Sequence, residues 1–372
     1  MIIRSRPIYF YFHLLVLFTL LLIPGISTIN AAVLAEDRTD LLYHSYDGGN
    51  ITINGPALLI RKGFAEDFSA TAHYYEDNIS SASIDVESYA SPYEEFRAEF
   101  GATMDYLYRD TILNISFTNS SENDYEANTL GLSMSHEMFY GLTTLNLGYS
   151  RGADTVGKST DPTFNQEVDR ARYHFGVSQV ITKKLLLTVD LESISAVGFL
   201  NNPYRAVRIN GAFNQPERYP RTRSGLAVAT RGVYYLGNDS TLMLGYRYYT
   251  DNWAIDSHTL EARYNHFYSS KLLAEYSVRY YTQVQASFYN DDFDQPYFYM
   301  ARDKEMSTFS SYSLGYKLSY KIFESNSFFK RGDINLSYNF FQYNYDNFTH
   351  YATGDLYSYN ANVITLFYST RY

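Results

Sequence analysis

The chain contains no cysteine, only nine prolines and one tryptophan, and fewer basic residues (30) than acidic residues (40). Without cysteine it can have neither a disulfide framework nor a lipid-modified N-terminal cysteine. The formal net charge of −10 argues against nucleic acid as a partner, because phosphate backbones attract basic surfaces. The sequence has no glycine-rich phosphate loop and no histidine cluster with metal-ligand spacing. It therefore predicts no cofactor and no bound metal.

Long hydrophobic runs are missing beyond the N-terminus. Residues 1–35 are predicted to be a signal peptide, because Arg4 and Arg6 precede an apolar run from Ile8 to Ile23 and Ala35 ends a small-residue cleavage site. The run is shorter than the roughly 20 residues that span a bilayer, which disfavours the alternative of an uncleaved membrane anchor. Residues 36–372 form one predicted domain, with no segment long and apolar enough for a transmembrane helix.

Aromatic residues are abundant, with 40 tyrosines and 25 phenylalanines, and aromatic side chains favour strands. Between Tyr312 and Ile322 every second residue is apolar, and the residues between them are serine, glycine or lysine. A period of two predicts a strand with different surroundings on its two faces. The same alternation predicts strands at 51–63, 67–78, 95–107, 111–120, 125–137, 141–151, 169–182, 184–195, 222–236, 240–250, 255–267, 271–286, 307–322, 330–345 and 356–372.

The connections between these strands are alternately short and long. The long ones are residues 79–94, 152–168, 196–221 and 287–306, which is the pattern of a barrel with short periplasmic turns and long extracellular loops. A closed antiparallel barrel needs an even number of strands, and Thr39–Tyr46 supplies a sixteenth. The predicted fold is thus all-β, a single closed antiparallel transmembrane β-barrel of about sixteen strands, or fourteen if one hairpin is lost.

The last strand, Asn360 to Tyr372, runs to the final residue and ends in an aromatic side chain. It resembles the closing strand of a bacterial outer-membrane barrel, in which tyrosines lie at the membrane interface. The expected location is the bacterial outer membrane. The expected partners are outer-membrane lipid, lipopolysaccharide, and the barrel-assembly machinery acting through the strand that ends at Tyr372.

Five segments resemble those of an uncharacterised family from Gram-negative bacteria, catalogued as domain of unknown function three-five-seven-zero. They are His44–Gly49, Ser80–Val86 with Ala90–Tyr93, Gly198–Arg205, Tyr246–Trp253 and Ala301–Glu305. The resemblance covers essentially all of residues 36–372 and implies an outer-membrane-type barrel. It implies no substrate and no residue roles, since the family has no assigned activity.

If the leucine, isoleucine and tyrosine positions face lipid, the residues between them line the lumen. The candidate channel-lining residues carry both charges and are Arg231, Arg247, Glu261, Arg263, Glu275 and Arg279. Pairing across the turn at 268–270 predicts Arg263 opposite Glu275, with Glu261 diagonal to Arg279. These charges are predicted either to form a ring that sorts solutes or to neutralise one another as a network inside the barrel.

The loop from Val197 to Ser224 reverses the acidic balance of the chain. Its arginines outnumber its single acid, Glu217, and are Arg205, Arg208, Arg218, Arg221 and Arg223. Folded into the mouth, they would attract anionic solutes, because guanidinium groups suit carboxylate and phosphate. The alternative is an outer loop whose arginines meet lipopolysaccharide phosphates or the acids of residues 76–95.

The sequence thus favours a porin-like channel or transporter for a small solute that it does not identify. Two alternatives are a plugged structural or binding barrel that acts through its extracellular loops and, more remotely, a lipid-modifying enzyme. No catalytic residues are predicted: Asp256 and His258 share one strand face and Ser257 lies on the other, so they cannot form a local triad. Asp291, Asp292 and Asp294 lack a known Ca²⁺-loop spacing and are expected to form a solvated loop.

Overall fold

A computed structural model describes residues 32–81, 93–211 and 213–372. The predicted signal peptide, residues 1–35, lies almost wholly outside the described residues, as does much of the predicted loop 79–94. Among the described residues, no helix is long and apolar enough to cross a membrane.

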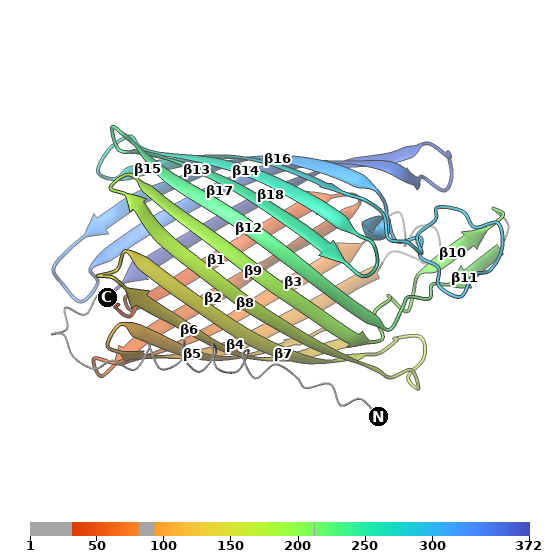
Figure 1. The fold of residues 1–372 in the computed structure, drawn as a ribbon, viewed down its shortest axis with the longest axis horizontal. Coiled ribbons are helices and arrows are strands. Elements are labelled where there is room, and N and C mark those ends of the chain that lie inside the picture. The colour runs from red at the N-terminus through yellow and green to blue at the C-terminus, as the bar shows by residue number, and fades with distance from the viewer. Residues whose placement is uncertain (1–31, 82–92, 212) are drawn as a thin grey trace, which may run out of the picture.

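Sixteen antiparallel strands form one closed barrel (Figure 1). They are β1 (Arg38–Gly48), β2 (Ile51–Phe64), β3 (Phe68–Ser81), β4 (Tyr93–Tyr108), β5 (Thr111–Ser121), β6 (Tyr125–Met138), β7 (Thr143–Val156), β8 (Gln166–Thr182), β9 (Leu185–Gly198), β12 (Thr222–Gly237), β13 (Ser240–Asp251), β14 (Asp256–Phe267), β15 (Leu272–Gln283), β16 (Phe309–Glu324), β17 (Arg331–Thr349) and β18 (Leu356–Arg371). The prediction of sixteen strands is confirmed, and the fallback of fourteen is not needed.

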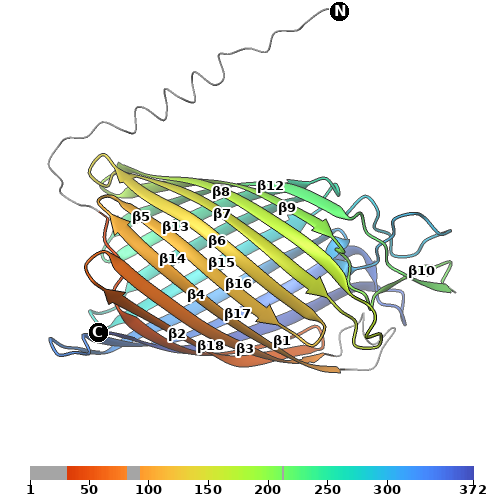
Figure 2. The same ribbon diagram turned by 90° about the horizontal axis from the view of Figure 1, so that it is seen from below.

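The barrel closes where the first strand pairs with the last. Strand β1 pairs with β18 from Arg38 opposite Arg371 to Gly48 opposite Ala361, and it also pairs with β2 on its other side (Figure 2). A closed barrel leaves no sheet edge with unpaired amide and carbonyl groups. The predicted sixteenth strand, Thr39–Tyr46, is therefore the strand that completes the wall.

The alternation in the sequence becomes two faces of the wall. Leu244, Leu314 and Ile364 point outward, and each exposes about half of its side-chain surface, 56%, 52% and 49%. Residues directly opposite each other on neighbouring strands share a face, so the outward set continues from strand to strand. An apolar outer face that is left uncovered by protein is what a lipid-facing wall requires.

Aromatic side chains gather at two levels of the outer face. Those nearest the short turns include Tyr108, Tyr234, Tyr268 and Tyr320. Those toward the opposite end include Tyr149, Tyr173, Tyr246, Tyr280 and Tyr312. Between the two levels lie aliphatic residues such as Leu147, Val189 and Leu244. This is the arrangement of aromatic girdles around an apolar band.

The two ends of the barrel differ as predicted. Strand pairs β2–β3, β4–β5, β8–β9 and β12–β13 are joined by short turns at one end, called the short-turn end. At the other end, called the long-loop end, residues 199–221 connect β9 to β12 and residues 284–308 connect β15 to β16. These loops contain a small hairpin, β10 (Ala206–Ile209) with β11 (Phe213–Pro216), and the 3-10 turn η1 (Lys304–Met306), neither of which the sequence predicted.

The predicted pairing across the β14–β15 turn is wrong by two residues. Glu261 lies opposite Arg279, and Arg263 lies opposite Ser277 rather than Glu275. The cause is the position of the turn. The Tyr268 amide donates to the Leu272 carbonyl at 2.9 Å, so the chain reverses one position later than predicted. A shift of two preserves which face each residue occupies, so the predicted lumenal face is unaffected.

We expect Leu244→Arg to destabilise assembly, because it places a charge in the apolar outer band at a cost of about 2–4 kcal/mol near midplane. Thr241→Arg, on the inner face of the same strand, should be tolerated. Heat-modifiable migration of the two variants on gels measures folded barrel directly. Equal loss of folded barrel in both variants would contradict the assigned faces.

Candidate functional site

Below the rim pair of Arg223 and Asp251, the inner face of β12–β15 carries four arginines, and we call this sector the basic wall. Arg231 is opposite Gly245, Gly245 is opposite Glu261, and Glu261 is opposite Arg279, so these residues form one row across four strands. Arg247 and Arg263 lie on the same face in the flanking rows. Strand pairing therefore brings five of the six predicted channel-lining residues together, and the sixth, Glu275, lies opposite Lys317 on β16.

The arginine side chains of the basic wall reach into open space. Arg231 and Arg279 are exposed, and the side chains of Arg263 and Arg247 expose 45% and 38% of their surface. Neighbouring Arg172 on β8 exposes 60% of its side chain and shares the Glu192 carboxylate with Arg247, at 3.0 Å and 3.3 Å. Side chains that point inward yet stay exposed show that residues of the wall do not fill the lumen.

An acidic network lies across the lumen from the basic wall. Strands β4 and β14 are eight places apart in the ring of sixteen, so they face each other. On β3 and β4, Asp77 contacts His44 at 2.8 Å and Arg97 at 4.0 Å, while Asp105 accepts from Ser69 at 3.0 Å and Arg61 at 3.4 Å. Asp77 and Asp105 are buried, so their charges are satisfied within the wall.

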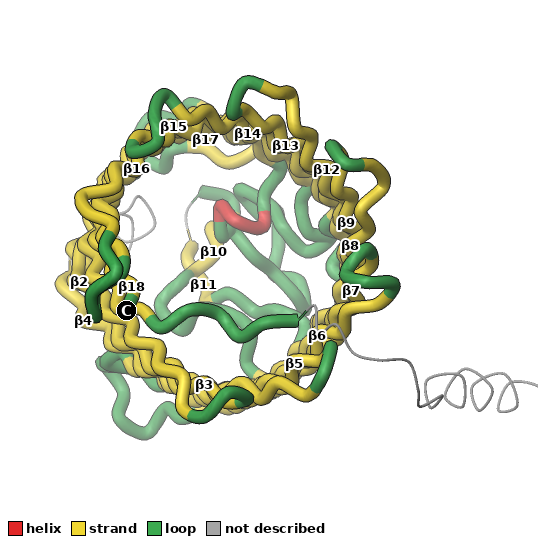
Figure 3. The backbone as a smooth tube through the Cα atoms, turned by 90° about the vertical axis from the view of Figure 1, so that its left-hand side faces the viewer, coloured by secondary structure: helices red, strands yellow, loops and turns green. Residues whose placement is uncertain are grey.

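The two long loops pack together into one unit, which we call the cap (residues 199–221 and 284–308). The cap lies at the long-loop end in Figure 1 and, seen along the barrel in Figure 3, extends across part of the opening. Backbone hydrogen bonds join the loops, with the Arg218 and Met300 amides and carbonyls bonding each other at 2.9 Å and 2.8 Å. Tertiary pairing of segments distant in sequence thus replaces the solvated loops that the sequence suggested.

The cap has apolar cores of its own. One contains Val207, Ile209, Phe293 and Met300, and the other joins Tyr219, Phe288 and Tyr289 to Trp253 in the β13–β14 turn. Burial raises the pKa of the Tyr219 phenol well above its ordinary value, and the nearby Glu217 carboxylate adds to the effect. The hydroxyl therefore stays protonated and donates to Glu217 at 2.8 Å.

Three of the five predicted loop arginines have carboxylate partners. Arg205 pairs with Asp303, Arg208 with Asp291 at 3.1 Å, and Arg223 with Asp251 at 2.7 Å. Arg221 bonds the Gln166 side chain at 3.2 Å, and Arg218 stacks over the Phe298 ring at 5.8 Å.

The acids that meet these arginines come mainly from the second loop. Residues 199–221 hold four basic residues and one acid, residues 284–308 hold two basic residues and five acids, and the cap therefore contains six of each. The local excess of positive charge in the sequence is cancelled in the folded cap. The predicted attraction of anions by this loop stays a prediction.

Arg302 holds the cap to the barrel, although no role for it was predicted from the sequence. Its side chain is 3% exposed, pairs with Asp291 at 2.9 Å, and donates to the Thr349 carbonyl at 2.8 Å. Its guanidinium also lies 4.6 Å from the centre of the buried Phe348 ring. Thr349 and Phe348 belong to β17, so one arginine links cap and wall. The only sequence signal for it was the family resemblance of Ala301–Glu305.

One group of acids among the described residues has a geometry that could hold a metal ion. It is distinct from Asp291, Asp292 and Asp294, the acids examined in the sequence. Glu95, Glu122 and Asp124 bring one carboxylate oxygen each within 4.8 Å of one another. Burial raises the pKa of Glu122, while Arg97, 3.8 Å away, opposes that rise. Asp291, by contrast, is occupied by Arg208 and Arg302.

Asp256, Ser257 and His258 do not form a catalytic arrangement. His258 bonds the Tyr246 hydroxyl at 2.8 Å and Asp256 bonds the Tyr248 hydroxyl at 2.9 Å, whereas Ser257 is buried on the other face. The structure therefore agrees with the strand geometry that separates Ser257 from its neighbours.

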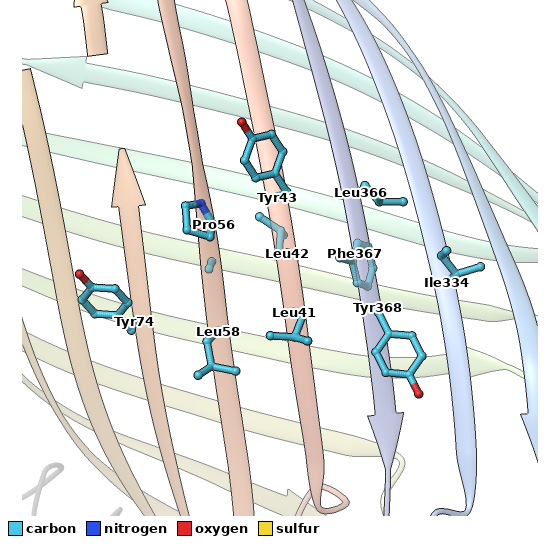
Figure 4. Close-up of a pocket in the computed structure, with 11 residues that line it drawn as sticks. Leu41, Leu42, Tyr43, Pro56, Leu58, Tyr74, Ile334, Leu366, Phe367 and Tyr368 are labelled. Carbon is cyan, nitrogen blue, oxygen red and sulfur yellow. The ribbon is translucent and has the colours of Figure 1, made fainter. Parts of the chain in front are cut away.

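Two apolar hollows mark the outer face. One lies over the β1–β18 seam and is lined by residues that include Leu41, Leu58, Leu366 and Pro56 (Figure 4). The other is lined by residues such as Met104, Leu113 and Leu147. Both belong to the lipid-facing side, so the lumen and its cap are the candidate site for a water-soluble ligand.

The comparison with protein families gives one result. Residues 158–361, which are 204 of 372 residues, match the family described as "Protein of unknown function (DUF3570)". The chain belongs to the DUF3570 family. Of the five segments that carried the resemblance, Gly198–Arg205, Tyr246–Trp253 and Ala301–Glu305 lie inside the DUF3570 match, and all three contribute residues to the cap or its contacts.

No curated protein matches the chain. Among solved structures, the siderophore receptor PirA from Pseudomonas aeruginosa is similar at 9% identity and a TM-score of 0.45, covering 85% of this DUF3570 chain and 60% of the receptor. The chain thus spans about three fifths of that receptor's length. A bacterial polysaccharide outer membrane secretin is similar at 8% identity and a TM-score of 0.48, covering 90% and 98%. At these values neither likeness bears on function.

We expect Arg302→Ala to loosen the cap while leaving the barrel closed. Removing one partner of a buried ion pair costs about 3–5 kcal/mol, and here it also removes a bond to β17. Hydrogen exchange of peptides from residues 284–308 should speed up markedly in the folded protein. Arg218→Ala is the matched control, because Arg218 is exposed and its ring contact is at the surface. Unchanged exchange in the Arg302 variant would show that Arg302 does not hold the cap.

Proposed function

We propose that the protein is a channel of the bacterial outer membrane that passes small hydrophilic solutes through its lumen. The observation that carries the proposal is the inward-pointing but exposed set of arginines on the basic wall. A sixteen-stranded barrel is wide enough for an aqueous channel unless loops plug it. Charged side chains that have no protein partner are stable only in contact with water.

The proposed location rests on the predicted signal peptide, the apolar band and the two aromatic levels. In this orientation the short-turn end faces the periplasm and the cap faces the outside. Tyr372 would lie at the periplasmic interface, where its ring stacks on Phe328 at 5.4 Å. Contact with lipopolysaccharide, and assembly through β18, are part of the same proposal.

The cap supports a second candidate, a binding barrel that acts through its outer surface. Its interior is packed and three of its arginines, Arg205, Arg208 and Arg302, pair with aspartates, so it is built as a fixed structure. At its surface Tyr297, Phe298 and Tyr299 expose 47%, 71% and 39% of their surface. Exposed aromatic residues in a row are a common feature of contact surfaces.

Conductance in planar bilayers tests the proposed channel. The wild-type protein should give discrete ion-conducting steps. Replacing residues 200–220 and 286–306 together by short Gly-Ser linkers should raise the step size about twofold or more, since both halves of the cap leave the mouth. Both loops are removed because each alone would expose the apolar core of the other.

No conductance from either protein, with both showing heat-modifiable migration, would overturn the channel proposal. Conductance only after removal of the cap would favour the second candidate, because the intact barrel would then be closed by its cap.

A further inference from the structure

We infer that the lumen carries anionic solutes, and that Arg231 and Arg279 form the anion-binding step along its basic wall. The inference rests on the proposed channel function and specifies the solute class. It places anion selection inside the barrel rather than at the mouth, where Arg205, Arg208 and Arg223 pair with acids.

The first argument is the difference in pairing among the lumenal arginines. Arg263 is paired with Glu261 on its own strand, and Arg247 shares Glu192 with Arg172. Within the described chain, neither Arg231 nor Arg279 has a carboxylate oxygen within 4.0 Å. Although Glu261 is the strand partner of Arg279, its carboxylate turns to Arg263. These two guanidinium groups therefore keep their charge and donors for a solute.

The second argument is the charge balance of this half of the lumen. Three rim pairs, Arg170 with Asp154, Arg223 with Asp251 and Lys321 with Glu324, can be set aside because they are neutral. The inner face of β8–β16 then has six basic side chains and four acidic ones, an excess of two. The basic ones are Arg172, Arg231, Arg247, Arg263, Arg279 and Lys317, and the acidic ones are Asp190, Glu192, Glu261 and Glu275.

The third argument is accessibility across the lumen. Asp77 and Asp105 on the facing wall expose only 8% and 11% of their side chains, and each already has a cationic or hydroxyl partner. Arg231 and Arg279 are exposed. A passing ion therefore meets accessible positive charge at Arg231 and Arg279, and the two aspartates of the facing wall are covered. Guanidinium groups bind oxyanions through paired N–H donors, so carboxylate and phosphate groups are the expected cargo chemistry.

The test combines Arg231→Gln and Arg279→Gln and reads two quantities. The chloride-to-potassium permeability ratio, from reversal potentials at about 0.1 M salt, should favour chloride in the wild type and fall about twofold or more in the variant. Binding of inorganic phosphate to the folded barrel in detergent, measured by calorimetry, should weaken about tenfold. Lys271→Gln is the control, because this substitution removes a positive charge from the exposed turn between β14 and β15, outside the lumen.

Replacing both arginines by lysine separates charge from geometry. The lysine variant should keep the chloride preference but bind phosphate more weakly, because lysine cannot donate in the paired manner of arginine. If the double glutamine variant fails to show heat-modifiable migration, each single glutamine variant should give part of both changes.

The outcomes separate this inference from the channel proposal. A wild-type barrel that binds phosphate but never conducts would overturn the channel proposal and leave the anion site standing. A conducting wild-type barrel that prefers potassium, or one whose chloride preference is unchanged in the glutamine variants, would overturn the inference. An equal effect of Lys271→Gln would also overturn it, because the two arginines would then have no special role.

Discussion

In a lipid bilayer every backbone amide and carbonyl must find a partner within the protein, and the pairing of β1 with β18 meets that requirement. Once the ring is closed, each residue points either to lipid or to the lumen, because side chains alternate along a strand. The leucines of the outer band and the arginines of the basic wall are two results of this one constraint. An open edge between β1 and β18 would leave unpaired backbone groups in hydrocarbon and remove the distinction between the two faces.

The protein uses charge in two different ways. In the cap, Arg205 and Arg208 pair with aspartates across the two loops. Arg302 pairs with Asp291 within its own loop, so these charges cancel and the geometry is fixed. Removing one partner would leave an uncompensated buried charge, which destabilises the folded cap. On the basic wall, Arg231 and Arg279 stay in solvent, where a charge needs no protein partner and can act on a solute. The cap thus determines the shape of the mouth, and the arginines of the basic wall produce the positive electrostatic potential in the lumen.

The alternation predicted fifteen strands and the lumenal face of the candidate residues, because a period of two is a local property of the sequence. The sixteenth strand followed from the even number of strands that a closed antiparallel barrel needs. The register of β14 against β15 was missed, since it depends on where the turn at Tyr268 closes. The partners of the cap arginines were missed for a different reason: Arg208 and Asp291 are 83 residues apart, and no local pattern records such a contact. The family-like segments did mark the region, as Trp253 and Asp303 lie among them. The lack of a carboxylate partner at Arg279 could not be predicted either, because Glu261 is close to both Arg263 and Arg279 in the sheet and pairs with Arg263 only in the folded structure.

The central claim is that the inner face borders water and the outer face borders lipid. Since the chain has no cysteine, a single introduced cysteine can be labelled without background from other thiols. Ser313 faces the lumen, opposite Arg279 on β15, and its neighbour Leu314 faces outward. With the barrel in lipid vesicles, a water-soluble maleimide too polar to enter the bilayer should label Ser313→Cys quickly and leave Leu314→Cys unlabelled. Equal labelling of the two, or labelling of Leu314→Cys alone, would contradict a water-filled lumen bounded by this wall.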